Sequence, residues 1–160
     1  MGAISVAHSL GISFKEIVLG VEQLITPPMT MEKKGEYRRA ILIDDTFNVN
    51  PLSIAAAVEY MKSLTEKKYL VLQPMIELGK EASKLHEEIG KQIVSVCDGV
   101  FLTNTNYYND IVHNISKEVR KKFIIAKPLA VAEQLKKILQ KGDVVVFEGR
   151  EARVFLEKLL

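Results

Sequence analysis

Residues 41–53 read Ile-Leu-Ile-Asp-Asp-Thr-Phe-Asn-Val-Asn-Pro-Leu-Ser, and this stretch decides the fold. Its apolar start is typical of a strand that is buried on both faces, as in a parallel sheet. Asn50 followed by Pro51 is typical of a helix start, with asparagine as the N-cap and proline in the first turn. The stretch therefore predicts a strand, a polar loop that begins at Asp44 and Asp45, and a helix.

The same order of strand and helix repeats along the rest of the chain. Short apolar runs of β-forming residues predict strands over 40–43, 69–72, 100–103, 123–125 and 144–147. Apolar residues at helical spacing predict helices over 52–64, 83–96, 107–120, 128–139 and 151–160. Repeated strand–helix–strand units have right-handed crossovers, so the sequence predicts an α/β fold with a doubly wound, mainly parallel sheet and helices on both faces.

The first part of the chain has a different pattern. Residues 3–10 and 14–24 predict two short helices, and Pro27-Pro28 ends the second. Glu32-Lys33-Lys34-Gly35-Glu36 is expected to be a polar connector. We therefore divide the chain into residues 1–36, the end of a preceding domain with its linker, and residues 37–160, one α/β domain.

Composition excludes several classes of function. The chain has 160 residues, enough for one well-buried domain, and a formal net charge of +2. This balance gives no electrostatic footprint for nucleic acid or an anionic membrane. No run approaches the roughly 20 apolar residues that cross a bilayer, and the start lacks the pattern of a signal peptide. We therefore expect a cytoplasmic protein with neither a nucleic-acid nor a membrane partner.

Motifs for metal and phosphate binding are missing from the sequence. A single cysteine, Cys97, excludes an internal disulfide and a cysteine-rich zinc site. His8, His86 and His113 are scattered, so we expect no metal site. Neither a phosphate-binding loop nor a Gly-x-Gly-x-x-Gly fingerprint is present. We interpret His86 as a helix-surface or boundary residue and Cys97 as a small buried hydrophobe.

Two loops are candidates for ligand binding, because ligands of open parallel sheets bind beyond the carboxyl ends of the strands. In the loop from Asp44 to Asn50, carboxylates and amides can bind a ligand while Phe47 covers a flat ring. The alternative is that its asparagines only form turns and cap the helix. The loop of residues 103–110, Thr-Asn-Thr-Asn-Tyr-Tyr-Asn-Asp, has the same two interpretations.

Asp44-Asp45-Thr46-Phe47-Asn48-Val49-Asn50-Pro51 resembles the Asp-Asp-x-Tyr-Asn-Ala-Asn-Pro motif in the C-terminal domain of Mur ligases. Residues 75–79 and 85–90 are similar to the family's Met-Leu-Glu-Leu-Gly and Leu-His-x-x-x-Gly blocks. Residues 141–145 are similar to its Pro-Gly-Asp-Val-Val strand. Within the family, the sequence most resembles the type that adds D-alanyl-D-alanine to the UDP-muramoyl tripeptide. The resemblance implies the Rossmann-like fold of this C-terminal domain.

The resemblance also implies an activity for the complete enzyme. Mur ligases use ATP and Mg to make an amide bond in peptidoglycan synthesis, for the bacterial cell wall. An acyl phosphate on a UDP-sugar peptide is attacked by an amine, here that of a D-amino dipeptide. The family's phosphate-binding loop, magnesium ligands and modified lysine belong to an upstream central ATPase domain of the same polypeptide. This chain would be the C-terminal lid, which excludes water but has no catalytic residue, binds no cofactor tightly and is inactive alone.

Residue by residue, the resemblance assigns two sets of contacts. The implied nucleotide contacts are Asp45, Phe47, Asn48 and Asn50. The implied loops for the amine substrate carry Asn104, Asn106, Gly149 and Arg150. Because the implied partner of Asp45 is a nucleotide, we expect Asp45→Ala to destabilise the isolated domain less than Asn50→Ala does.

The sequence differs from the family pattern in three places. Thr30 replaces the arginine of the linker motif Gly-Arg-x-Glu, and Gln73-Pro74 replaces Gly-Asp. Glu148 replaces the lysine of Lys-Gly-Ser-Arg-Gly. Thr30 and Glu148 favour an alternative, a stand-alone binding or regulatory module that kept the fold without catalysis, whereas the helices before Pro27 favour a fragment of a ligase. A folate polyglutamate ligase is a third possibility, but its Ala-His-Asn-Pro loop differs from Asn48-Val49-Asn50-Pro51.

Overall fold

Six strands form one sheet in the computed structural model, which describes residues 2–25 and 27–160. In sheet order they are β1 (Glu32–Tyr37), β2 (Ala40–Asp45), β6 (Val144–Glu148), β3 (Lys68–Leu72), β4 (Gly99–Leu102) and β5 (Phe123–Ile125). β1 pairs antiparallel with β2, and the other neighbours pair in parallel. The predicted α/β fold with a mainly parallel sheet is confirmed. Met1 and Thr26, both in the predicted N-terminal segment, lie outside the described residues.

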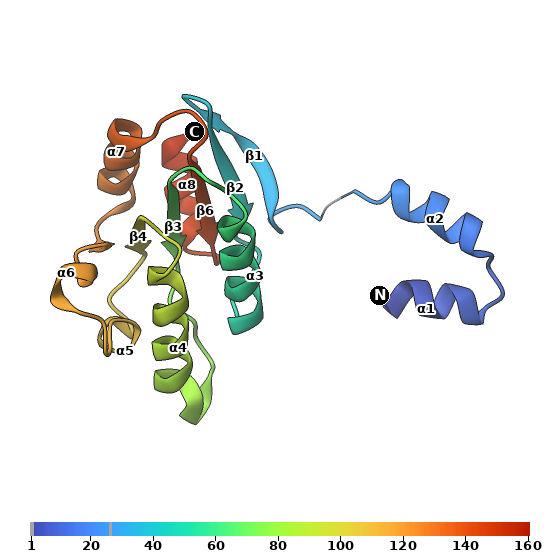
Figure 1. Cartoon of the computed structure of the whole chain (residues 1–160), viewed down its shortest axis with the longest axis horizontal. Coiled ribbons are helices and arrows are strands. Elements are labelled where there is room, and N and C mark those ends of the chain that lie inside the picture. Colours follow the sequence, from blue (N-terminus) through green and yellow to red (C-terminus); the bar gives the residue numbers. More distant parts are fainter. Residues whose placement is uncertain (1, 26) are drawn as a thin grey trace.

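Helices cover both faces of the sheet (Figure 1). One face packs against α3 (Pro51–Lys62) and α4 (Ala82–Val94). The other packs against α7 (Pro128–Ile138) and α8 (Ala152–Leu159). Successive residues of β3 alternate between the two cores, because side chains of a strand point to opposite faces in turn. Both faces are therefore buried, which explains the continuous apolar runs of the strands.

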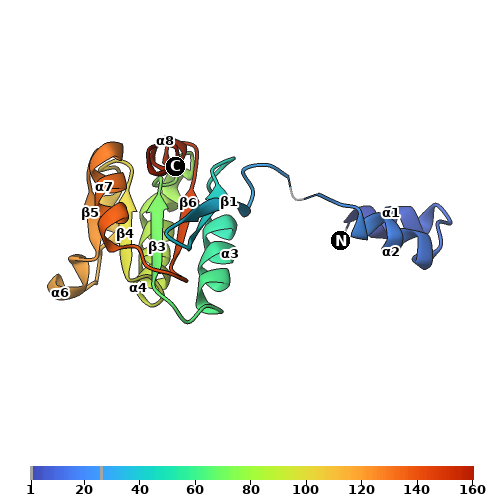
Figure 2. The same ribbon diagram turned by 90° about the horizontal axis from the view of Figure 1, so that it is seen from above.

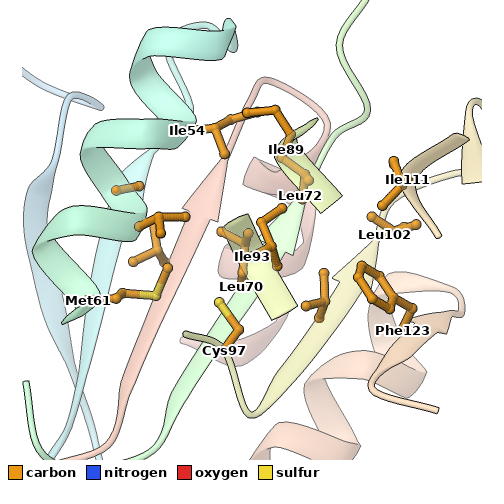
Figure 3. Packing of buried hydrophobic residues seen from close by; sticks show 14 of the residues in the cluster. Ile54, Met61, Leu70, Leu72, Ile89, Ile93, Cys97, Leu102, Ile111 and Phe123 are labelled. Atoms are coloured by element: carbon orange, nitrogen blue, oxygen red, sulfur yellow. The ribbon is translucent and has the colours of Figure 1, made fainter. Parts of the chain in front are cut away.

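The core between the sheet and helices α3 and α4 is built from aliphatic side chains (Figure 3). Leu70 and Leu72 of β3 pack there with Ile54 of α3 and Ile93 of α4, and each is at most 1% exposed. Burial of each such side chain contributes about 1.5–3 kcal/mol. Cys97 is 1% exposed in the same cluster, and burial raises the pKa of its thiol to about 12. The interpretation of Cys97 as a small buried hydrophobe is confirmed.

Two predictions of secondary structure are wrong. Residues 107–120 form two single turns, α5 (Tyr108–Ile111) and α6 (Lys117–Arg120), because Asn114 has the left-handed φ of +58° that interrupts a helix. Residues 32–36 are part of strand β1 and are no connector. The strand lacks an apolar run because it lies at the edge of the sheet, where it has one pairing partner and its charged side chains remain in solvent. Its sequence therefore resembles that of a polar connector.

The two N-terminal helices are confirmed as α1 (Gly2–Ser9) and α2 (Phe14–Glu22), and they stand apart from the sheet (Figures 1 and 2). Ser13 and Glu16 form a capping box at the start of α2. Apolar side chains of this pair remain exposed, for example Phe14 at 62% and Leu24 at 76%. Among the described residues, no helix has the length and apolar character needed to span a bilayer.

Candidate functional site

The loops that follow β2, β3, β4 and β6 meet at the carboxyl edge of the sheet. Backbone hydrogen bonds join them: Gly149 donates to the carbonyl of Asp45 at 3.1 Å and Gln73 to that of Glu148 at 3.0 Å. Thr103 donates to the carbonyl of Leu72 at 3.0 Å. The site predicted from the strand order is therefore assembled from segments that are far apart in the sequence.

Asn50 caps helix α3 as predicted. Its Oδ1 accepts hydrogen bonds from the backbone N–H groups of Leu52 at 2.9 Å and Ser53 at 3.0 Å. The Ser53 hydroxyl accepts in return from the N–H of Asn50 at 3.0 Å, and Pro51 occupies the first turn. This reciprocal arrangement is a capping box, and it fixes the exit of the candidate loop.

Asp44 and Asp45 both have partners within the fold. Asp44 Oδ1 accepts from the hydroxyl of Thr46 at 2.6 Å and from its N–H at 3.1 Å. Asp45 is 7% exposed, and its Oδ1 accepts from the N–H of Met31 in the linker at 3.0 Å. Asp45 therefore has a partner within the fold. Its contact with a nucleotide stays a prediction.

Glu148 is a buried acid at the end of β6, with an exposed fraction of 0%. Its Oε1 accepts a hydrogen bond of 2.6 Å from the hydroxyl of Ser53. Burial, followed by a side-chain hydrogen bond with Asp45, raises the pKa of Glu148 to about 9. This raised pKa predicts a protonated, uncharged side chain at neutral pH, whereas the sequence indicates only that an acid replaces the family's lysine.

The first of two cavities at this edge, here called the Phe47 cavity, has a volume of about 350 Å³. It is lined by Met29, Thr46, Phe47, Arg150 and Arg153. Phe47 is 61% exposed, and its backbone carbonyl accepts a hydrogen bond of 3.1 Å from Nε of Arg150. Sequence analysis missed Arg153, because one arginine in the first turn of a helix gives no signal.

The second, here called the Asn48 cavity, has a volume of about 380 Å³. It is lined by Asn48, Val49, Asn50, Gln73, Ile76, Glu77, Leu78 and Arg150. Arg150 lines both cavities and lies there with Phe47, Asn48 and Asn50, whereas the other residues predicted for the amine substrate, Asn104, Asn106 and Gly149, line neither cavity. Gly149 lies in the wall between the loops with φ +88°, and a Cβ atom there would come within 2.8 Å of Cβ of Gln73.

The loop after β4 is held by Glu151, a residue that sequence analysis missed. Glu151 Oε2 accepts from the hydroxyl of Thr103 at 2.6 Å and from Nδ2 of Asn104 at 2.7 Å. Its N–H donates to Oε1 of Gln73 at 2.9 Å. The sequence gives no signal for Glu151, because its partners lie 47, 48 and 78 positions away. Asn106 is exposed, and its N–H donates to Oδ1 of Asn104 at 2.8 Å.

His86 is buried, so its interpretation as a surface or boundary residue is wrong. It is 1% exposed, and its ring stacks on that of Tyr107 with centroids 4.1 Å apart. The N–H of Met75 donates to Nε2 at 3.1 Å, while Nδ1 lies 2.7 Å from the carbonyl of Ala82. Because Nε2 accepts, the proton lies on Nδ1 and the ring is neutral. Desolvation lowers the pKa of His86, in agreement with this state.

A metal site would need a cluster of ligating side chains. Within residues 2–25 and 27–160, no three His, Cys, Asp or Glu side chains gather closely enough to hold a metal ion.

Together, the fold and the site define a class: a doubly wound α/β domain whose ligand-side edge unites the loops after four parallel strands. The chain belongs to the Mur ligase family, since residues 31–150 match the domain described as Mur ligase, glutamate ligase domain. The family resemblance of the sequence is thereby confirmed.

Curated relatives with the name UDP-N-acetylmuramoyl-tripeptide–D-alanyl-D-alanine ligase are similar to part of the chain. The relative from Rickettsia prowazekii is 35% identical over 86 residues, which are 51% of this chain and 18% of the relative. The relative from Bacillus subtilis is 33% identical over 95 residues, 58% of this chain and 21% of the relative. The chain thus matches about a fifth of the length of these relatives.

Solved structures share the fold. The MurF ligase from Thermotoga maritima in complex with ADP superposes with a TM-score of 0.76 at 28% identity, over 98% of this chain and 35% of that chain. A MurF from Acinetobacter baumannii superposes with a TM-score of 0.79 at 21% identity, over 98% and 35% of the two chains. The Rossmann-like fold that the resemblance implied is confirmed.

Proposed function

We propose that the chain is the C-terminal lid domain of an ATP-dependent ligase that joins a D-amino dipeptide to a UDP-sugar peptide. The observation that carries this proposal is the convergence of Phe47, Asn48 and Arg150 on two adjoining cavities at the carboxyl edge of the sheet. The similarity to curated D-alanyl-D-alanine ligases, and to a MurF ligase in complex with ADP, supports it.

The residues at this edge fit a nucleotide. The exposed ring of Phe47 offers an apolar face to a flat base, and the exposed Asn48 offers amide donors and acceptors. Asn50 would mainly position the loop and not bind the nucleotide itself, because its Oδ1 already caps α3. When bound, ATP with Mg supplies the phosphoryl group that activates a carboxylate. The residues of this chain bind, orient and exclude water from the reacting groups.

The amine substrate would lie toward the loop after β4. Glu151 holds Thr103 and Asn104 there and is itself fixed by Gln73. Gly149 lets this wall approach the Asn48 cavity closely. This arrangement supports an assignment of Asn104 and Arg150 to the amine side, with Asn106 as a residue that shapes the loop.

We propose that helices α1 and α2 are the end of a preceding ATPase domain, as the division of the chain at residue 36 expects. This proposal is supported by an apolar hollow of about 460 Å³ between the two helices, whose lining includes Ile4, Ile17 and Leu24. Strand β1 moves the start of the sheet domain to about residue 31, where the family match also begins. A ligase that uses ATP and UDP-sugar peptides works in the cytoplasm, and we place the protein there.

The proposal is tested with a chimera in which residues 31–160 replace the corresponding C-terminal domain of the Bacillus subtilis ligase. ADP formation that needs both the UDP-muramoyl tripeptide and D-alanyl-D-alanine is the expected result. Phe47→Ala in the chimera should lower kcat/KM for ATP by about ten-fold, the size of a lost ring contact. Tyr60→Ala is the matched control, because Tyr60 is a half-exposed aromatic residue of α3.

The chain alone separates the two functional hypotheses. We expect no phosphate release and only about millimolar affinity for ATP with Mg, since the phosphate-binding loop is missing from its sequence. An inactive chimera combined with micromolar binding of ATP by the chain would instead favour a stand-alone binding or regulatory module.

A further inference from the structure

The Phe47 cavity is positively charged. Two of its five lining residues are arginines, Arg150 in the turn before helix α8 and Arg153 in its first turn, and the described lining includes no acidic side chain. The other lining residues are Met29, Thr46 and Phe47. A cavity of about 350 Å³ therefore combines guanidinium groups with an exposed aromatic ring.

The nearby acids leave the charge of Arg150 uncompensated. Burial raises the pKa of Glu148 to about 9, and Asp45 is 7% exposed and accepts from the N–H of Met31. Glu151 Oε2 is engaged with Thr103 and Asn104. Among the described residues, Glu157 is the one acid that pairs with a cavity arginine, through Nε of Arg153 at 3.1 Å, and both side chains of that pair are more than half exposed. Glu157 therefore offsets the charge of Arg153 in part, whereas no acidic side chain of the described residues pairs with Arg150.

Both arginines are held in position through atoms that leave donors free. Arg150 is fixed through Nε, which donates to the carbonyl of Phe47 at 3.1 Å. Arg153 Nη1 contacts Sδ of Met29 at 3.0 Å, so α8 touches the linker. The described part of the chain provides no acceptor for the two Nη groups of Arg150. A guanidinium fixed in this way keeps a planar fork of donors, which suits the oxygens of a phosphate or a carboxylate.

We infer that Arg150 and Arg153 form an oxyanion site beside the Phe47 ring. The identity of its oxyanion rests on the proposed function, which offers two sources: the phosphates of a nucleotide and the terminal carboxylate of the dipeptide. The neighbouring linker carries Thr30 and no arginine, so the positive charge that lines this cavity comes from Arg150 and Arg153. Arg153 becomes a binding residue that sequence analysis did not assign.

The test is a titration of the chain followed by amide NMR shifts at constant ionic strength. The probes are tripolyphosphate, ATP with Mg, D-alanyl-D-alanine and adenosine. We expect at least one oxyanion to shift the amides of Thr46, Phe47 and Gly149, while adenosine alone shifts them weakly. Arg150→Gln and Arg153→Gln should each weaken this binding by about five-fold or more.

Arg38→Gln is the matched control, because it removes one positive charge from the turn between β1 and β2, where Arg38 lies 5.5 Å from the Tyr37 ring centroid. This turn precedes β2, whereas the cavity lies beyond its carboxyl end. Arg150→Lys keeps the charge but loses the fork, so its affinity should lie between those of the wild type and Arg150→Gln.

The probes separate the two sources of the oxyanion. Binding of tripolyphosphate and ATP identifies a phosphate, binding of the dipeptide identifies a carboxylate, and either supports the site. The inference is overturned if no oxyanion shifts these amides, or if Arg38→Gln weakens binding as much as Arg150→Gln. Anion binding with an inactive chimera would reject the proposed function alone. An active chimera without arginine-dependent binding would reject this site alone.

Discussion

Glu148 lies directly opposite Asp45 in the parallel pairing of β6 with β2, and the two residues are 0% and 7% exposed. With both groups ionised, Oε2 of Glu148 would be a buried oxygen without a hydrogen-bond donor among the described residues. A proton on Glu148 turns this oxygen into a donor to Asp45, while Ser53 donates to Oε1. Asp45 accepts in turn from Met31, so the pair ties α3, β6, β2 and the linker together.

This pair predicts a pH dependence of stability. The pKa of Glu148 is about 9 in the folded state and ordinary, near 4.5, in the unfolded state. Between these values the unfolded chain loses a proton that the folded chain keeps, so the free energy of unfolding falls as pH rises, by up to about 1.4 kcal/mol per pH unit. Urea unfolding of the wild type from pH 6.5 to 8.5 should show this fall.

Glu148→Gln should abolish most of that dependence, because the amide keeps a donor for Asp45 and does not titrate. The unfolding slope must be unchanged for the comparison to hold. Parallel pH profiles of the wild type and Glu148→Gln would contradict a protonated Glu148.

The contacts of Asp45 favour the opposite order for two substitutions to the one expected from the sequence. Asn50→Ala removes the cap of α3 and should cost about 0.5–2 kcal/mol. Asp45→Ala removes the acceptor of both Met31 and Glu148 and leaves a buried hydroxyl unpaired, which costs about 1–3 kcal/mol for the lost partner alone. Urea denaturation should therefore show Asp45→Ala as the more damaging change.

Asp45→Asn is the control, since it keeps one side-chain oxygen and should cost less than Asp45→Ala. A cost of Asp45→Ala below that of Asn50→Ala would show that the buried carboxyl pair contributes little to the fold.

The part of the site that is local in sequence could be predicted from it. The cap of α3 depends on Asn50, Pro51 and Ser53, which are neighbours along the chain, and the pattern there specified the loop and its place on the sheet edge. The strands could be predicted because both faces are buried, so that their apolar runs are continuous. Edge strand β1 lacks this pattern and was mistaken for a connector.

The rest of the site depends on tertiary contacts. Glu151, Arg153 and the protonation of Glu148 follow from partners in other loops, which no local pattern reports. The burial of His86 also depends on tertiary contacts. Its helix has an amphipathic pattern, but Met75 and Tyr107 come from two other segments and enclose the ring. The family resemblance assigned ligand contacts to the loops at this edge, which stay predictions, and it implied none of these tertiary contacts.

His86 should make the domain less stable in mild acid. Its pKa is lowered in the folded state, because burial disfavours the imidazolium. Protonation would also place a proton on Nε2 against the N–H of Met75. As pH falls below the ordinary value near 6.5, the unfolded chain takes up the proton first, and stability is lost until pH passes the folded pKa. Nitrogen-15 NMR of the ring at pH 6 should show the neutral form with the proton on Nδ1; an imidazolium signal would contradict this.

Gly149 should tolerate no side chain, because two independent restraints act on it. Its φ of +88° is rarely adopted by L-residues, and a Cβ atom would lie 2.8 Å from Cβ of Gln73 and 3.1 Å from Cβ of Val49. These contacts join the Asn48 cavity to the loop that carries Arg150, so the wall must shift to admit a methyl group. Gly149→Ala should therefore lower the free energy of unfolding by about 1–3 kcal/mol and weaken oxyanion binding together with it.

Gly20→Ala is the matched control for this substitution. Gly20 lies in helix α2, has an ordinary φ and has no described atom within 4 Å of an added Cβ, so alanine there should be neutral or stabilise the helix by up to about 1 kcal/mol. Urea unfolding measures stability, and the tripolyphosphate titration measures the site. If Gly149→Ala matches Gly20→Ala in both measurements, the close approach of Gln73 and Val49 to Gly149 does not hold the wall in place.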